Sequence, residues 1–454
     1  MLSPGASVVL ALAIVSSVAV WRMQKPTPEG MTFWVFAKTH FDTYQSAIPS
    51  WNAAHPDHPM ILSHLDAGAL ERRMLSGFLA GTPMADLFEA ERAMAGKAFV
   101  GPLESVGFMD ITDRLCDEGL IEQINAPSFS PWTSRGRIFG IPHDVHPVML
   151  AYRSDLVEAA GIDVSQIETW DDYFRLLRPL QQDFGGDGRP DRWLLNAWDT
   201  NAEVVQMLFY QADGIYFDEQ DRPRLNDPRN AAIIARLVTW FTGPHRVSTD
   251  VEMFSAMGHK ERLEGVIIGS LVADWMAGMW RLEIPGLAGK VKLMPMPAWK
   301  PGGRRTSVWG GTMMAINRRT PEPELAWAFA KELYLSPKNA ETLYRKTMII
   351  TPVKSLWNLP VFDEPDPFYS GQKVGRLLIE LAPQVPMRPS SPYANMAQQR
   401  LTSAVLALRA YADAQQVYDE VALRPEAQRL LDLGQGQLAR SISRNSFLTP
   451  DDEP

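Results

Sequence analysis

The stretch RGRIFGIPHDVHPVMLAYRSDLVEAAGIDVSQIETWDDYF, residues 135–174, decides how the rest of the chain is arranged. It begins with a short polar strand and a Gly-Ile-Pro turn, and an apolar, β-prone run follows over residues 145–152. Pro142 has a fixed φ and no backbone N–H. We therefore expect the chain at Pro142 to pass between two bodies rather than through the centre of a sheet.

Two short helices are predicted after this apolar run. Ser154 can cap the first helix, and Gly161 stands where a left-handed C-terminal cap would lie. Thr169 begins the second helix, and Asp172, three residues later, supplies the acidic half of a capping box.

Length and composition indicate an ordinary globular protein. A chain of 454 residues can bury a large core and should form two or more lobes. A formal net charge of −9, with no basic domain, argues against nucleic acid as a partner. Cys116 is the only cysteine, so one chain can hold neither a disulfide framework nor a cysteine-based zinc site. We interpret this thiol as a small apolar side chain.

The N-terminal segment carries a membrane-targeting signal. Residues 6–21 are uncharged and mostly apolar, which suits the apolar region of a signal peptide, and Ser17-Val18-Ala19 offers a cleavage site. Arg22 and Lys25 follow the apolar run, and the positive-inside rule would then keep the body in the cytoplasm. We nevertheless favour export, with either a cleaved signal or an uncleaved anchor, and interpret residues 24–30 as a linker.

The body opens with alternating strands and helices. Strands are predicted at 31–37, 60–65 and 85–90, with helices between them, and this β-α-β-α-β order implies a parallel sheet with right-handed crossovers. Ligands of such sheets bind at the carboxyl ends of the strands. That edge holds His40, Phe41, Glu89 and Glu91.

Five further stretches carry a resemblance to a known family. They are SGFLAGTPMADLFEAE (76–91), GRIFGIPHDVHPVMLAYRSDLVEAAGID (136–163) with TWDDY (169–173), LVADWMAGMW (271–280), VWGGTMMAINRRTPEPELAWAFAKELYLSP (308–337) and MIITPVKS (348–355). In this order and spacing the chain, nearly everywhere after Gly30, resembles the family 1 extracellular solute-binding proteins of ABC importers. This is the sugar-binding group that includes maltodextrin- and glycerol-phosphate-binding proteins.

The resemblance implies an α/β fold of the periplasmic-binding-protein type II, with two Rossmann-like lobes that are joined by hinge crossings and close on a solute. Gly140-Ile141-Pro142 would form the first crossing, with His143 and Asp144 at the cleft mouth, and residues 290–299 would form the second. The expected divisions are 1–30 for the signal or anchor with its linker, 31–141 and 297–350 for the N-terminal lobe, 142–296 and 351–447 for the C-terminal lobe, and 448–454 for the tail.

The later part of the chain is expected to hold more helix than strand. Helices are predicted from Thr320-Pro321, over 394–414 and over 415–440, and the Pro-rich region 357–391 is expected to be irregular.

Sugars present apolar ring faces and a rim of hydroxyl groups, which aromatic and polar side chains recognise respectively. By position, the expected ligand-binding residues are His40, Phe41, Glu89, Asp144, Trp198, Asp274, Trp275, Trp309 and Gly310. Each has another interpretation, because His40 could cap a helix, the carboxylates could pair with Arg or Lys, and each Trp could lie in a core. Lys38 and Arg281 would matter for an anionic solute.

A Gly-rich loop with three aspartates, Asp183, Asp187 and Asp191, is similar to a calcium loop. An EF-hand-type loop needs Asp or Asn at its third position and Glu at its twelfth, where this chain has Gly185 and Leu194. We therefore expect a polar turn, with no metal and no cofactor in the protein.

These observations predict an extracytoplasmic, periplasmic receptor, with residues 6–21 as an optional tether. The receptor is expected to be a monomer that captures a sugar, oligosaccharide, polyol or glycerol phosphate and presents it to an inner-membrane ABC permease. It is not expected to be an enzyme, because no G-x-S-x-G, H-E-x-x-H, Walker or G-x-G-x-x-G motif occurs. The alternatives are a membrane-tethered solute sensor and, third, a glycoside hydrolase that uses Glu89 and Glu91.

Overall fold

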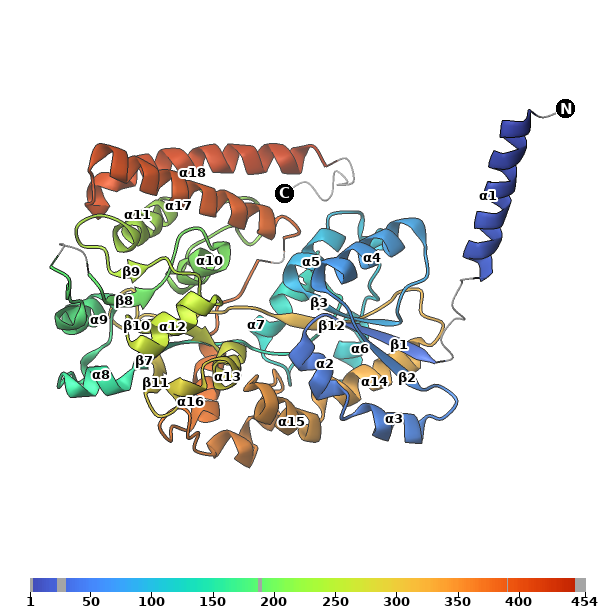
Figure 1. The fold of residues 1–454 in the computed structure, drawn as a ribbon, viewed down its shortest axis with the longest axis horizontal. Coiled ribbons are helices and arrows are strands. Elements are labelled where there is room, and N and C mark those ends of the chain that lie inside the picture. Colours follow the sequence, from blue (N-terminus) through green and yellow to red (C-terminus); the bar gives the residue numbers. More distant parts are fainter. Residues whose placement is uncertain (1–2, 23–29, 187–189, 390, 446–454) are drawn as a thin grey trace.

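The computed structural model describes residues 3–22, 30–186, 190–389 and 391–445. Two five-stranded sheets form two lobes, seen at the left and right of Figure 1, and helices cover the sheets. The prediction of an α/β fold with two lobes is confirmed.

The first sheet has the strand order β2-β1-β3-β12-β6. Its first three strands are parallel, as the β-α-β-α-β pattern predicted, and β12 adds antiparallel to both β3 and β6. In β1 every second side chain is fully buried, whereas β3, at the centre, is buried along nearly its whole length. The strands are β1 (Met31–Val35), β2 (Met60–His64), β3 (Leu87–Glu91), β6 (Ile141–Pro142) and β12 (Thr312–Ile316).

Helices of the first lobe connect and cover these strands, and a two-residue hairpin pair, β4 (Thr133–Ser134) and β5 (Arg137–Ile138), precedes β6. The helices are α2 (Lys38–Tyr44), α3 (Ile48–Ala54), α4 (Ala67–Ala80), α5 (Arg92–Ala98), α6 (Thr112–Asp117), α7 (Ala126–Phe129) and α14 (Pro323–Leu335).

The second sheet has the order β11-β7-β10-β8-β9, with β7 antiparallel to both of its neighbours. Its strands are β7 (Val148–Arg153), β8 (Trp193–Asn196), β9 (Ser248–Thr249), β10 (Ile267–Ala273) and β11 (Val291–Pro295). Every residue of β7 and β10 is buried, because helices and loops cover both faces of the sheet.

The C-terminal helices α17 and α18 pack on α10 and α11 of the second lobe, along the top of Figure 1. The remaining helices of this part are α8 (Ser154–Ala159), α9 (Trp170–Leu177), α10 (Ala202–Gln211), α11 (Pro228–Phe241), α12 (Ala256–Glu264), α13 (Asp274–Glu283), α16 (Val374–Leu381), α17 (Ala394–Gln415) and α18 (Glu420–Ser443). Helix α15 (Pro337–Thr347) lies between the lobes and contacts α2 and α14 on one side and α13 on the other.

Both predicted hinge crossings are wrong by several residues. Ile141 and Pro142 belong to β6 of the first sheet, and 291–295 form β11 of the second sheet. Pro142 and Pro295 are tolerated because β6 and β11 are edge strands of their sheets. This agrees with the expectation that Pro142 does not lie in the centre of a sheet. The chain crosses instead at residues 143–147 and 306–311, which pair with each other through Pro147 and Val308. We propose lobe boundaries inside these two crossings.

A third connecting segment covers residues 348–353. Ile350 packs in the core of the second lobe, and Val353 packs in a core of the first. The Asn125 N–H donates a hydrogen bond to the Pro352 carbonyl at 2.8 Å. Among the residues that the structure describes, three stretches of chain therefore join the lobes.

Local signals predicted some helix ends correctly and others not. Thr169 and Asp172 form the full capping box, and Gly161 has a φ of 68°. Ser154 does not cap α8, because it is the first helical residue and its side chain makes no capping bond. The region 357–391, expected to be irregular, contains α16 and short 3-10 turns, and Cys116 is exposed rather than part of a core.

The N-terminal helix α1 runs from Pro4 to Arg22. In the part of the chain that the structure describes, no helix combines the length and apolar character needed to cross a membrane. Tethering by residues 6–21 stays a prediction. Most of the predicted linker (24–30) and the predicted tail (448–454) lie outside the described residues.

Candidate functional site

A cavity of about 360 Å³ opens between the two lobes. It is lined by the carboxyl ends of β1 and β3, by α2 and α13, by both crossings and by the end of α15. The lining residues are Phe36, Ala37, Thr39, His40, Glu91, His146, Trp275, Gly278, Met279, Leu282, Gly310, Gly311, Thr312, Lys346, Thr347 and Ile349.

The first-lobe wall is supported by a buried carboxylate. Glu89 is fully buried on β3, and one of its oxygens lies 2.6 Å from His40 Nδ1 and accepts a 3.0 Å hydrogen bond from the Tyr44 hydroxyl. Burial alone would raise the pKa of Glu89, but the neighbouring His40 outweighs it and brings this pKa below its ordinary value. Glu89 therefore holds the His40 ring at the cavity wall instead of lining the cavity itself.

Glu91, two residues further along β3, does line the cavity. One oxygen accepts a hydrogen bond of 2.7 Å from the Ala93 N–H at the start of α5, and Arg92 lies beside the other. Burial raises the pKa of Glu91. In the part of the chain that the structure describes, Glu91 is the only carboxylate in the lining and offers a hydrogen-bond acceptor to a solute.

A row of buried titratable groups forms the wall at the crossings. His146 Nε2 lies 2.9 Å from Asp144, and His146 Nδ1 lies 2.6 Å from Asp274 at the start of α13. Burial alone would lower the pKa of His146, but the two carboxylates raise it to about 10. Burial alone would raise the pKa of Asp144, but His146 and His143 bring it well below its ordinary range. His146 is therefore a cation at neutral pH.

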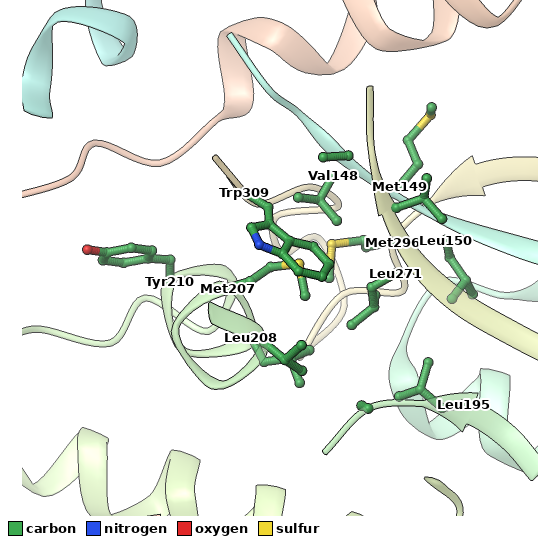
Figure 2. Close-up of a cluster of buried hydrophobic side chains, with 14 of the residues drawn as sticks. Val148, Met149, Leu150, Leu195, Met207, Leu208, Tyr210, Leu271, Met296 and Trp309 are labelled. Carbon is green, nitrogen blue, oxygen red and sulfur yellow. The ribbon is translucent and has the colours of Figure 1, made fainter. Parts of the chain in front are cut away.

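The second-lobe wall is aromatic. Trp275 follows Asp274 in the first turn of α13, and its indole N–H donates a 3.0 Å hydrogen bond to the Trp309 carbonyl. The Phe254 ring stacks on Trp275 with ring centroids 5.9 Å apart. The Trp309 indole lies among Met207, Met296 and Leu271 in the second core, as Figure 2 shows.

Two glycines bring backbone to the cavity surface. Gly310 and Gly311 have φ values of 98° and 125°, which side chains rarely adopt. A Cβ at Gly310 would lie 3.0 Å from both the His146 ring and the Trp275 indole nitrogen, and one at Gly311 would lie 2.7 Å from the Arg388 guanidinium. The second crossing therefore brings main chain without side chains close to Trp275, and the Gly310 carbonyl accepts a hydrogen bond from the Arg388 guanidinium.

The predicted ligand residues divide into three groups. His40, Trp275 and Gly310 line the cavity, while Glu89, Asp144 and Asp274 lie behind it and bond to the lining imidazoles. Those that do not line it are Phe41, which packs on the first core, and Trp198 and Trp309, both in the second core. The weaker candidates Lys38 and Arg281 pair with Asp42 and Asp366.

The three-aspartate loop contains the polar turn expected. One Asp191 oxygen accepts hydrogen bonds from the N–H groups of Phe184 and Gly185, and Asp183 accepts one from Gly186. Asp187 lies outside the described residues. Across the described ranges, no group of three His, Cys, Asp or Glu side chains is placed to hold a metal ion.

The sequence did not lead us to expect His146 or Lys346 in the site, and we expected Glu89 rather than Glu91 to be the ligand-binding carboxylate. Glu91 could have been found, because the last residue of a parallel strand reaches furthest toward the binding edge. His146 has a φ of 54°, and Lys346 lies on α15, far along the chain from the first-lobe lining residues His40 and Glu91, so no local pattern marks either residue.

This arrangement is suited to binding. An indole plane can stack on an apolar ring face, while Glu91, His40, Lys346 and nearby backbone groups can bond to hydroxyls around it.

Comparison with known proteins agrees with this geometry. Residues 37–341 match the family model described as bacterial extracellular solute-binding protein. An arabinooligosaccharide-binding protein of Halalkalibacterium halodurans is 25% identical over 366 residues, which cover 79% of this chain and 80% of that protein. An arabinooligosaccharide-binding protein of Bacillus subtilis is also 25% identical over 366 residues, 78% and 77% of the two chains. The sugar-binding protein MalE of Xanthomonas citri superposes with a TM-score of 0.72 at 15% identity, covering 91% of this chain and 99% of that chain.

Proposed function

This chain belongs to the bacterial extracellular solute-binding proteins, and from that membership we propose that it captures a carbohydrate between its lobes for an ABC importer. The family acts outside the cytoplasm. An oligosaccharide of pentose units is the first candidate solute, because the two relatives above are named for arabinooligosaccharides.

One observation carries this proposal. Trp275 presents an indole to a cavity that both lobes line, next to the backbone of Gly310, and Glu91 belongs to the same lining. A sugar ring needs this combination of an apolar plane and hydroxyl-binding groups at its edge.

Closure of the lobes would couple binding to delivery. His40 and Glu91 come from the first lobe, and Trp275 and Met279 come from the second, so a solute reaches both sets only when the lobes are shut. The closed form is then the state that an inner-membrane permease would engage, with the receptor acting as a monomer.

Catalysis is not part of this proposal. The hydrolase alternative needs two carboxylates at the scissile bond, but Glu89 is fully buried behind His40. Glu91 is left as a single carboxylate in the described lining, which suits an acceptor for hydroxyl groups.

Isothermal titration of the full chain with arabinotriose, lactose, maltose and glycerol 3-phosphate tests the proposal. We expect saturable binding of at least one of the sugars, accompanied by quenching or enhancement of tryptophan fluorescence. Absence of heat and of any thermal shift with all four compounds would contradict carbohydrate capture.

A further inference from the structure

His146 occupies an unusual backbone position in the first crossing. Its φ of 54° lies in the left-handed region, and its side chain is buried while still forming part of the cavity wall. A residue other than glycine keeps this conformation only where the surrounding structure enforces it. The contacts of its ring show what enforces it here.

Each ring nitrogen of His146 faces a different buried carboxylate, Asp144 at 2.9 Å and Asp274 at 2.6 Å. A neutral imidazole has a single N–H and would turn a lone pair toward one of the two carboxylates. An imidazolium donates to both, and its raised pKa agrees with this form. The other titratable or charged side chains of the described lining are His40, Glu91 and Lys346, and none of them has a described bond to the ring.

The two carboxylates bond in turn to the other segments that join the lobes. Asp144 accepts a hydrogen bond of 3.2 Å from the Thr312 N–H at the end of the second crossing. Asp274 accepts one of 3.2 Å from the Ile350 N–H in the third connecting segment, and one of 2.8 Å from the Trp275 N–H. The first connection between the lobes thus contains His146, and the other two are linked to its charged ring through Asp144 and Asp274.

The same contacts set the position of the aromatic wall. The Trp275 indole donates to the Trp309 carbonyl, and the Trp309 N–H donates to the His146 carbonyl at 3.4 Å. Gly310 fits between the His146 ring and the Trp275 indole with no room for a side chain. A displacement of the ring would therefore move both the indole and the Gly310 backbone.

We propose that His146 is a positioning residue of the solute site, whose positive charge holds the Trp275 indole and the Gly310-Gly311 backbone in the arrangement that accepts a sugar ring. The inference rests on the proposed function and extends it, because solute affinity would depend on a charge that need not touch the solute. Without this cation Asp144 and Asp274 would lose the positive charge that lies between them, and buried like charges repel strongly.

Titration with arabinotriose provides the first test, using H146Q, the double variant D144N/H146Q and the control H259Q on the outer helix α12. With His146 as a cation, the group of His146, Asp144 and Asp274 has one net negative charge. H146Q raises this net negative charge to two, and D144N/H146Q returns it to one. The bonds described for the Asp144 carboxylate all end on one oxygen, which an asparagine can keep. We expect the Kd for arabinotriose to rise about tenfold or more in H146Q, because His146 is coupled to both carboxylates in one network. The double variant should recover most of the lost affinity. H259Q should bind as the unaltered chain does.

The ligand-free protein provides a second test that does not depend on the identity of the solute. H146Q should change the near-ultraviolet circular dichroism of the tryptophans, and the change should largely vanish in a W275F background. If H146Q does not fold, two other variants replace it. The first is D144N/H146Q, compared with D144N, and the second is H146K, which keeps the positive charge. An unchanged Kd and spectrum in folded H146Q, or a double variant no better than H146Q, would overturn the role of His146. Absence of arabinotriose binding to the unaltered chain, with the spectral change intact, would count against the proposed function alone.

Discussion

At the scale of single residues, the groups that face the cavity differ from the groups that hold them there. Trp275, His40 and Glu91 form its surface, whereas Glu89, Asp144 and Asp274 are buried one layer behind and bond to the imidazoles. Substitutions in the two layers should therefore have different effects, because loss of a surface group such as the Trp275 indole removes a contact with the solute, whereas loss of a buried carboxylate removes the support of the site.

Replacing Trp275 with alanine should weaken sugar binding by about 2 kcal/mol, or ~30-fold in Kd, because a central aromatic contact is lost. Titration calorimetry with the best-bound sugar measures this. W198F is the matched control, since Trp198 packs in the second core. It should lower Tm and leave Kd unchanged. Equal effects of W275A and W198F on Kd would contradict the assignment of Trp275 to the binding surface.

The charge on His146 should make stability fall at alkaline pH. Its pKa is raised from the ordinary 6.5 to about 10, so the folded chain binds this proton more tightly than the unfolded chain. The contribution of this proton to the free energy of unfolding is therefore complete below pH ~6.5 and is lost as the pH rises toward ~10. Burial and the neighbouring Arg92 also lower the pKa of Arg388, to about 10.

Comparison of the unaltered chain with H146Q separates the two groups, because both proteins contain Arg388. The difference in Tm between them should be largest near pH 6 and should shrink steadily toward pH 10. A difference that stays constant over this range would mean that His146 is not a cation in the folded protein.

At the scale of elements, α13 connects most parts of the site. It begins at Asp274 directly after β10, so one turn supplies the carboxylate for His146 and the Trp275 indole, and the next turn supplies Gly278 and Met279 to the cavity. A Cβ on Gly278 would lie only 2.1 Å from the Thr347 carbonyl oxygen at the end of α15. The fit between α13 and α15 therefore depends on glycine at this position.

G278A should destabilise the protein by about 1–3 kcal/mol, the cost of overpacking at a close backbone contact, and should weaken sugar binding by moving α13. Denaturant unfolding and titration measure the two effects. G436A in α18 is the matched control, because the nearest atom to its Cβ is the end of the Arg440 side chain at 3.4 Å. G436A should be neutral, or stabilising by up to ~1 kcal/mol from helix propensity. A neutral G278A would contradict this account of the contact.

Elements with a local signal could be predicted from the sequence, and those defined by distant partners could not. The capping box of Thr169 and Asp172 lies within four residues, and it was predicted correctly. Ile141 and Pro142 looked like a hinge because their partner β12 comes some 170 residues later. For the same reason the indoles of Trp198 and Trp309 could not be assigned to core or cavity from the sequence, since burial depends on which strands become neighbours.

At the scale of the whole molecule, the lobes also contact each other behind the cavity wall, next to Glu91. The Arg92 guanidinium, at the start of α5 in the first lobe, pairs with Glu203 and donates a 2.6 Å hydrogen bond to Gln206, both on α10 of the second lobe. Gln398 of α17 donates to Glu203 as well. These bonds join the two lobes in the arrangement described here.

R92Q should therefore shift the solute-free protein toward open forms and raise the Kd for sugar by about tenfold, the worth of hydrogen bonds to a charged group. Small-angle scattering should show a larger radius of gyration without solute and the unaltered value at saturation. R114Q, which breaks a pair with Glu324 inside the first lobe, is the control and should change neither quantity. An unchanged radius in R92Q would show that the pair does not hold the lobes together.

The position of β12 also determines when the protein can fold during its synthesis. β12 lies between β3 and β6 in the first sheet, and within the described residues β6 pairs with no other strand of that sheet, yet β12 is made only after strands β7 to β11 of the second sheet. A nascent chain that stops before Thr312 leaves the edge of β3 unpaired and one lobe unfinished. The first lobe thus reaches its native form only after about two thirds of the chain has left the ribosome, and the unfinished sheet keeps this lobe open to chaperones and to the export machinery until then.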